Sequence, residues 1–410
     1  MRITDVRADL LSSPMPEPIR MTYYGGERTI FKRDIALVRI STDRGLTGYG
    51  PAPVSKRVAA HINGLIRDAL MGEDPARGDA LRAKVLDSTS EDVSEAFSGV
   101  EIALYDLRGK MEGCPIHVLL GGKVRDRIRL YGSAGMYQPP ESYAEEAVAV
   151  AALGFSAYKL RPALGPEADL EIVRCVREAV GPTMGIMVDA HAWWRMGDRS
   201  YTPEGIEALA RDMAGYGITW LEEPLPPEDR MAYIRLREAG IVPIAAGENE
   251  ISFSGFMEII GQGAVDIVQA DVMHHGGYTS VKGILQACVE HRRPFAFHNW
   301  GTLLEALACA HLGVCFPAET CAWLEYPCFS HRGQDIMYPY PLADDILREP
   351  LSIEKGDLII PDGPGLGIEV DESVIARYPY VPGPWSVFRL ISPPEEWAMG
   401  SDDTINWEEK

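Results

Sequence analysis

Eight short apolar runs recur along residues 126–340, separated by stretches long enough to form helices. Successive landmarks in these runs are 23 to 33 residues apart: Tyr131, Lys159, Asp189, Glu222, Glu248, Asp271, His298 and Glu325. The intervening stretches are amphipathic, as in residues 169–180, whose apolar side chains share one helical face. Strands and helices in strict alternation predict a parallel sheet, and eight repeats predict a (β/α)8 barrel of about 200 residues or more, an α/β fold.

Ionisable residues stand at or near the C-terminal ends of six consecutive runs, from Asp189 to Glu325. The C-terminal ends of the strands form the active-site face of such barrels. Buried carboxylates are costly unless they are paired or bind a metal, so a purely structural core has no use for this pattern. The spacing therefore predicts a functional site at one mouth of the barrel.

Two further segments flank the barrel. Residues 1–125 combine a strand pattern over 34–41 with helical patterns over 58–70 and 93–111, which predicts a compact α+β domain. Residues 341–410 contain a Gly-Pro turn between two expected strands, which we expect to return to the first domain. The acidic tail from Pro393 has no periodicity, so we expect an irregular surface segment or an oligomer contact.

Composition excludes several classes of protein. The net charge is −21, which disfavours binding to nucleic acid or to an anionic membrane. Seven cysteines without a CxxC pair are typical of a reduced compartment, and no leader-like start or run of 18 apolar residues is present. A cytoplasmic protein that acts on a small molecule is expected.

Three carboxylates from successive strand ends predict a metal site. Asp189, Glu222 and Glu248 offer hard oxygen ligands with no cysteine among them, and such ligands favour Mg²⁺ over zinc. Carboxylates at strand ends can instead cap helix N-termini, which often happens singly. Three in consecutive strands favour metal binding.

The motifs themselves resemble those of a known family. The barrel segments contain VDA, WLEEP, GENE, QADVMHHGG, FH and WLEYP, and the flanking segments contain VEIALYDLRGKMEGCPIHVLLGG and DGPGLG. Together they resemble the enolase superfamily, in particular the mandelate racemase branch of the mandelate racemase and muconate lactonizing enzyme family. The resemblance implies a capping domain over the barrel. It also implies removal of a proton next to a carboxylate, with the enediolate held on Mg²⁺.

The resemblance also implies catalytic roles. Asp271 and His298 match the family's dyad, in which the carboxylate orients the imidazole base, although a structural hydrogen bond would also account for this histidine. Glu325 matches an electrophilic acid, which requires a raised pKa, and a salt-bridged structural role is the alternative. Glu223, next to Glu222, is expected to point to the other side of the strand or to support the ligands, and not to bind the metal itself.

The second strand departs from the family pattern. Racemases of this branch have Lys-x-Lys here, whereas this chain has Lys159 and Arg161. Arginine is a poor base at neutral pH but binds carboxylates well. Racemisation by two bases is therefore disfavoured. Abstraction by His298 from a 2R acid is the implied route.

A histidine on the third strand suggests dehydration. His191 follows the ligand Asp189 by two residues, so both side chains lie on one face. Sugar-acid dehydratases of the superfamily, galactonate dehydratase among them, have an acid in this position. Packing beneath the following tryptophans is the alternative for His191.

Substrate contacts are predicted in two places. Residues 20–26 match the position of the family's lid loop, whose Arg20, Tyr23 and Tyr24 would bind hydroxyl groups, and Trp193 would line the barrel side. Ordinary packing at a domain interface explains these residues equally well.

The resulting expectation is a Mg²⁺-dependent dehydratase that converts a sugar acid into its 2-keto-3-deoxy acid. A racemase, epimerase or cycloisomerase using the same enediolate is the alternative. A metal-dependent hydrolase is disfavoured because the first strand lacks His-x-His. A catalytically inactive protein that uses the fold for binding or assembly is disfavoured because the base, the acid and the metal ligands are all present. The family's habit of forming dimers and octamers implies a homo-oligomer.

Overall fold

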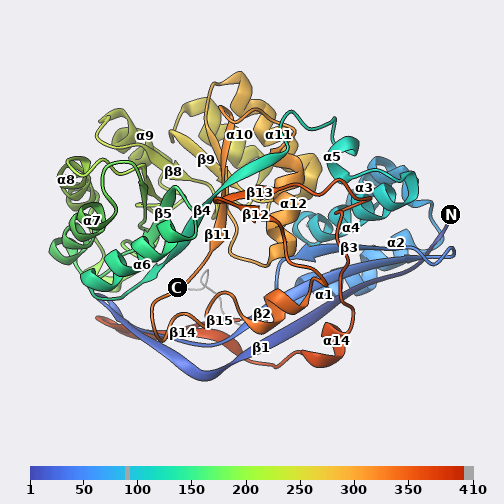
Figure 1. The fold of residues 1–410 in the computed structure, drawn as a ribbon, viewed down its shortest axis with the longest axis horizontal. Helices are drawn as coiled ribbons and strands as arrows, with labels where there is room; N and C mark the ends of the chain where they lie inside the picture. The colour runs from blue at the N-terminus through green and yellow to red at the C-terminus, as the bar shows by residue number, and fades with distance from the viewer. Residues whose placement is uncertain (88–92, 401–410) are drawn as a thin grey trace.

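Eight parallel strands close into a barrel in the computed structural model, which describes residues 1–87 and 93–400 (Figure 1). Each strand pairs with the next, and pairing of the last with the first closes the barrel. This confirms the predicted architecture. The strands are β4 (Arg127–Met136), β5 (Ala157–Arg161), β6 (Gly185–Asp189), β7 (Trp220–Glu222), β8 (Ile244–Ala246), β9 (Ile267–Ala270), β10 (Phe295–Phe297) and β11 (Cys321–Pro327).

A helix connects each barrel strand to the next. These helices bury one apolar face against the strands, as in α7, where Ile172, Val173 and Val176 are buried. They are α6 (Pro140–Ala152), α7 (Pro166–Val180), α8 (Pro203–Ala214), α9 (Arg230–Glu238), α10 (Phe253–Gln262), α11 (Gly277–Glu290) and α12 (Leu303–Gly313). None of the helices within the described residues is both long and apolar enough to cross a membrane.

The interior of the barrel is built in layers. One apolar residue from each strand contributes to a floor, in which Tyr131 of β4 packs edge-on against Trp220 of β7, with ring centroids 5.5 Å apart. The floor consists of Tyr131, Ala157, Met187, Trp220, Ala245, Ile267, Ala296 and Trp323. Side chains alternate along a strand, so the residue two positions later faces the same interior, one layer nearer the C-terminal mouth. In five strands that residue is Ser133, Lys159, Asp189, Glu222 or Glu325.

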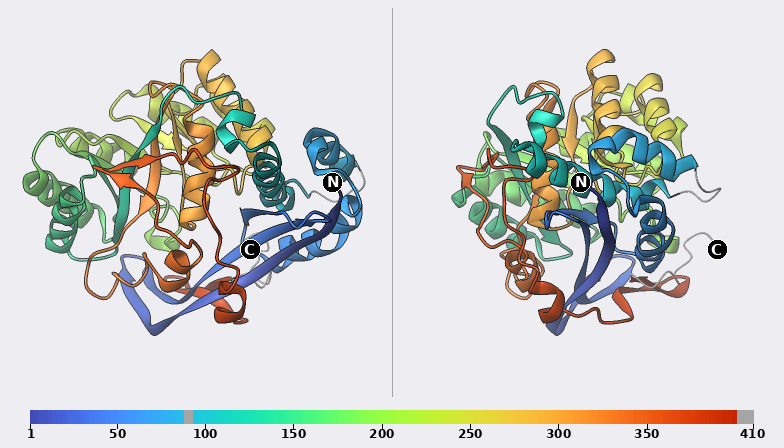
Figure 2. Two further views of the ribbon diagram at one scale, coloured as in Figure 1. Left: turned by 45° about the vertical axis from the view of Figure 1, so that its right-hand side comes forward. Right: turned by 90° about the vertical axis from the view of Figure 1, so that its right-hand side faces the viewer.

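An antiparallel sheet forms most of the second domain. Its strands lie in the order β1 (Ile3–Tyr23), β2 (Gly26–Thr42), β14 (Pro384–Ile391) and β15 (Pro394–Gly400), and β3 (Thr47–Ala52) pairs with β2. The C-terminal segment thus adds a hairpin to a sheet begun at the N-terminus (Figure 2). The helical part comprises α1 (Lys56–His61), a π turn (Ile62–Ile66), α2 (Arg67–Leu70), a 3₁₀ turn (Pro75–Arg77), α3 (Gly78–Asp87), α4 (Ser94–Glu112) and α5 (Ile116–Leu119).

Two sequence expectations are wrong here. Residues 20–26 are not a loop: they end β1, make a two-residue turn and begin β2. The turn is docked on the barrel, because Tyr24 N donates to Ala163 O at 2.7 Å and a Cβ at Gly25 would meet the Met196 side chain. The tail from Pro393 is not irregular over its described part, since residues 394–400 pair with β14 as a strand.

The Gly-Pro turn of the C-terminal segment lies against α4. Before it, β13 (Asp357–Ile359) pairs with β4 and with β12 (Ile353–Glu354), whereas the expected second strand makes only an isolated bridge from Val370 to Leu347. Asp106 of α4 accepts hydrogen bonds from Leu366 N at 2.8 Å and from Tyr49 N at 2.9 Å. It therefore ties α4 to both the turn and β3. The remaining helices are α13 (Pro341–Asp345) and α14 (Val374–Arg377).

Replacing Asp106 by Ala should destabilise the protein strongly. The buried carboxylate also pairs with Lys110 at 2.6 Å, so the variant removes the acceptor of the Leu366 and Tyr49 amides and leaves the Lys110 ammonium with Thr47 O alone among the described residues. We expect a loss of about 3 kcal/mol, measured from the midpoint of urea unfolding. Asp212→Ala, on the exposed side of α8, is the control and should cost under about 0.5 kcal/mol. Equal midpoints for the two variants would contradict the assigned role.

Candidate active site

Three carboxylates meet at the mouth of the barrel. Asp189 ends β6, Glu222 ends β7 and Glu248 follows β8, and one oxygen from each lies within 4.8 Å of the others. Trp220 Nε1 orients Glu222 by donating to its Oε2 at 2.9 Å. Three oxygen donors converging in this way fit Mg²⁺, with positions left for water and substrate oxygens. The structure thus brings together the three predicted ligands.

Glu223 lies behind this cluster, where the sequence analysis expected it. Its backbone has a positive φ of 46°, and its Oε1 accepts hydrogen bonds from the amides of Gly247 and Asn249 at 3.2 and 3.3 Å. It therefore holds the turn that carries the candidate ligand Glu248.

Lys159 is completely buried among the acids. Its Nζ contacts Glu222 Oε1 and lies 3.3 Å from Asp189 Oδ2 and 3.0 Å from Glu325 Oε1. Burial acts to lower the pKa of Lys159, but the surrounding carboxylates, Glu222 foremost, raise it well above its ordinary value. Lys159 is therefore a cation in this arrangement and a poor proton acceptor.

Arg161 lies on the same interior face as Lys159, two residues along β5. Its Nε is 3.1 Å from Asp189 Oδ2, and its Nη2 is 3.0 Å from Glu325 Oε1. The guanidinium also lies 4.2 Å from the centroid of the Trp300 ring. This residue is suited to binding a substrate carboxylate and, with a pKa raised further by these acids, cannot act as a base.

The electrophilic role predicted for Glu325 requires a raised pKa, whereas the charges around this carboxylate act in the opposite direction. Burial favours the neutral acid, but Lys159, His298 and Arg161 oppose it and lower the pKa to about 2. Ser133 Oγ also donates to Glu325 Oε1 at 2.5 Å. Glu325 is thus an ionised counter-ion for the two cations of β5, which is the salt-bridged alternative considered from the sequence.

A histidine and an aspartate form the expected dyad. His298 Nδ1 lies 2.9 Å from Asp271 Oδ2, and His298 Nε2 lies 3.5 Å from Glu248 Oε2. Burial lowers the pKa of His298, but Glu248 and Asp271 outweigh it and raise the pKa to about 10. Glu248 is one of the three candidate metal ligands, so a cation on that carboxylate would remove part of the interaction that keeps His298 protonated.

Asp271 has a second histidine partner that the sequence analysis did not assign. His274 Nδ1 lies 3.0 Å from Asp271 Oδ1, and His274 lines the pocket described below. Its position three residues after Asp271, in the motif VMHHGG, was the available signal.

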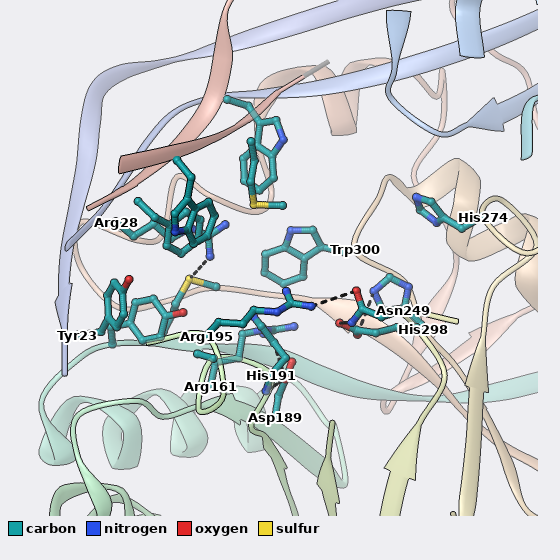
Figure 3. Close-up of a pocket in the computed structure, with 18 residues that line it drawn as sticks. Tyr23, Arg28, Arg161, Asp189, His191, Arg195, Asn249, His274, His298 and Trp300 are labelled. Carbon is teal, nitrogen blue, oxygen red and sulfur yellow. Dashed lines mark hydrogen bonds and ion pairs between the residues drawn. The ribbon is translucent and has the colours of Figure 1, made fainter. Parts of the chain in front are cut away.

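His191 stands beside the candidate metal ligands. Its Nδ1 lies 2.6 Å from Asp189 Oδ1, which leaves Nε2 to exchange a proton with a substrate. His191 and His298 both line one cavity, although they come from the ends of separate strands (Figure 3). A ligand in this cavity can therefore contact two imidazole groups.

The cavity has a volume of about 330 Å³ and lies between the barrel mouth and the capping sheet. The barrel contributes the charged residues. The capping sheet contributes a largely aromatic wall, and most of that wall was missed by the sequence analysis because its residues come from strands distant in sequence. The wall consists of Tyr23, Arg28, Trp385, Phe388, Trp397 and Met399.

Of the four predicted substrate contacts, the structure places only Tyr23 on this wall. Arg20 is exposed, because it alternates with the inward-facing residues of β1. Tyr24 is 39% exposed and lies beneath Arg199. Trp193 is fully buried in packing, with its Nε1 donating to Pro162 O at 3.1 Å.

Comparisons with known proteins agree with this geometry. Residues 142–374 match the family model described as enolase C-terminal domain-like, and residues 7–121 match the mandelate racemase / muconate lactonizing enzyme N-terminal domain. The fold and the site define an enzyme of the enolase superfamily. The chain belongs to its mandelate racemase and muconate lactonizing enzyme family, in which magnesium binding is typical.

Relatives are similar over nearly the whole chain. The chain is 31% identical to D-galactarolactone cycloisomerase from Agrobacterium fabrum, a match that covers 92% of this chain and 99% of the relative. It is 32% identical to D-xylonate dehydratase from Haloferax volcanii, a match that covers 83% of this chain and 84% of the relative. A crystal structure of an enolase superfamily member from Polaromonas sp. JS666 has a TM-score of 0.80 and 32% identity, covering 94% of this chain and 99% of that one.

Proposed function

We propose that the enzyme is a Mg²⁺-dependent acid-sugar dehydratase, a hydro-lyase that forms a 2-keto-3-deoxy acid. One observation carries this proposal: His191 and His298 line a single cavity beside the three clustered carboxylates. The name of the relative from Haloferax volcanii, D-xylonate dehydratase, supports the same reaction class.

The residues divide the reaction between them. Arg161 lines the cavity and is placed to bind the substrate carboxylate, with the buried Lys159 adding positive charge nearby. Mg²⁺ held by Asp189, Glu222 and Glu248 would neutralise negative charge that develops on the substrate. His298, oriented by Asp271, takes the proton from C2. His191 gives a proton to the hydroxyl on C3, the C3–O bond breaks, and water leaves. The resulting enol then becomes the 2-keto acid.

A cycloisomerase is the second candidate. The relative from Agrobacterium fabrum is named D-galactarolactone cycloisomerase and is matched over 99% of its length. Such a reaction also needs a base and an acid in one cavity. A screen of sugar acids and their lactones, read by mass spectrometry, separates the two, because only dehydration removes the mass of one water.

His191→Asn should separate the two proton transfers. We expect dehydration to fall by about 10²- to 10⁴-fold, because the leaving hydroxyl loses its acid. Exchange of the C2 proton with deuterium from the solvent should persist, since that step needs only His298 and the metal. NMR in D₂O measures both processes. Undiminished dehydration in the variant would show that His191 is not the acid. The dehydratase proposal would then lose the observation on which it rests.

A further inference from the structure

Arg28 is a cation of the capping sheet that faces the active-site cavity. Along β2, side chains alternate between the two faces of the sheet: Glu27 is partly exposed and lies 3.6 Å from Arg389, whereas Arg28 is 4% exposed and lines the cavity. In Figure 3 Arg28 lies across the cavity from Asp189 and His191. The guanidinium is therefore at the opposite end from the candidate metal ligands.

No carboxylate balances this charge. Within residues 1–87 and 93–400, Arg28 forms no ion pair: its Nε donates to Ser386 Oγ at 3.0 Å, and its Nη1 lies 3.1 Å from Met136 Sδ. The rings of Phe388 and Trp385 lie 4.6 and 5.4 Å from its Cζ. Burial lowers the pKa of Arg28 to about 10, which leaves it charged at neutral pH. Buried charges without a partner are costly, so an anionic ligand is the missing component.

A second buried polar group points to the same ligand. The hydroxyl of Tyr23, which also lines the cavity, is buried and has no hydrogen-bond partner within the described residues. The Tyr23 ring packs against that of Tyr137, with centroids 5.0 Å apart, and Tyr137 interacts with Arg28. A buried hydroxyl left unsatisfied is destabilising, so this donor also lacks its partner.

We propose that the substrate is a sugar diacid, whose second carboxylate binds Arg28 and the Tyr23 hydroxyl. This inference rests on the proposed function, since it places the reacting carboxylate at the metal end. A single unpaired guanidinium matches the single charge of a carboxylate better than a phosphate dianion. The other cavity cation outside the barrel strands, Arg195, instead stacks on Trp194 at 4.0 Å. The cavity of about 330 Å³ is near the lower limit for small-molecule sites, which suits one sugar unit.

The test compares diacids with monoacids. Hexaric acids and aldonic acids of matched configuration are assayed with the wild type, Arg28→Met, Tyr23→Phe and the control Arg389→Met. We expect the wild type to favour a diacid. Arg28→Met should lower kcat/KM for that diacid by about 10- to 100-fold and for the aldonic acid by under about 3-fold. Tyr23→Phe, which keeps the ring and its packing, should lower only the diacid value, and Arg389→Met should change neither.

Three outcomes would overturn the inference: a wild-type preference for the aldonic acid, equal losses on both acids in Arg28→Met, or a preference for an aldonic acid phosphate that depends on Arg28. Calorimetric binding of the diacid in the presence of Mg²⁺ provides a readout independent of turnover. If the diacid binds through Arg28 and exchanges its C2 proton without losing water, the dehydratase proposal fails while the diacid inference stands. If aldonic acids alone are dehydrated, the diacid inference fails while the dehydratase proposal stands.

Discussion

His298→Asn should abolish turnover and C2 proton exchange together. Both processes begin with removal of the same proton. The two residues of the second strand that could replace His298 as the base, Lys159 and Arg161, are held protonated by carboxylates. We expect kcat to fall by about 10²- to 10⁴-fold, which corresponds to about 3 to 5 kcal/mol of lost transition-state stabilisation. The measurement is a single-turnover assay with a 2R acid together with exchange in D₂O.

His291→Asn is the matched control, because this histidine is exposed at the end of α11. It should retain full activity. The variant pair also tests handedness: rapid dehydration of a 2S acid by His298→Asn, with exchange intact, would identify a different base and reject the assignment of His298.

Removal of the metal should reduce activity as strongly as His298→Asn. We expect EDTA to eliminate activity and Mg²⁺ to restore it, because the carboxylate cluster offers the only oxygen-only set of three donors found among the described residues. Glu222→Gln should weaken Mg²⁺ binding and lower activity by at least about 10²-fold. The fold should survive, since Lys159 keeps Asp189 and Glu325 as partners.

Thermal unfolding gives a readout that does not depend on turnover. Mg²⁺ at 100 times its Kd should stabilise the wild type by about 2.7 kcal/mol, and the same concentration should stabilise Glu222→Gln much less. Glu207→Gln, an exposed partner of Arg211 on α8, serves as the control. Equal stabilisation of Glu222→Gln and the wild type would show that Mg²⁺ binds elsewhere.

The charge states at the site were not predictable from the strands separately. The pKa of Glu325 depends on Lys159 and Arg161, which belong to a strand that is not adjacent to β11 in the barrel. Only closure of the barrel brings these three side chains together. The same closure makes Lys159 a buried counter-ion of three carboxylates.

The capping wall is the second feature that needed the tertiary structure. Trp385 and Phe388 come from a strand more than 350 residues after Arg28, and pairing of β14 with β2 places them beside it. Pairing of β15 with β14 in turn makes the expected irregular tail, over residues 394–400, part of the sheet. No local pattern marks such contacts, because the register between two distant strands is set by the whole sheet.

The sequence alone was sufficient for the barrel, the three carboxylates, the His298 and Asp271 pair and the position of His191. The barrel, the carboxylates and the position of His191 follow from local rules: alternation along a strand sets which residues face inward, and parallel strands of a closed barrel end at one mouth. The pairing of His298 with Asp271 was implied by the family resemblance. The tertiary structure decided which groups are ionised, which predicted substrate contacts reach the cavity, and that Arg28 faces it with no carboxylate partner among the described residues. Those properties depend on burial and on distances between residues remote in sequence, and electrostatic energies change steeply with both.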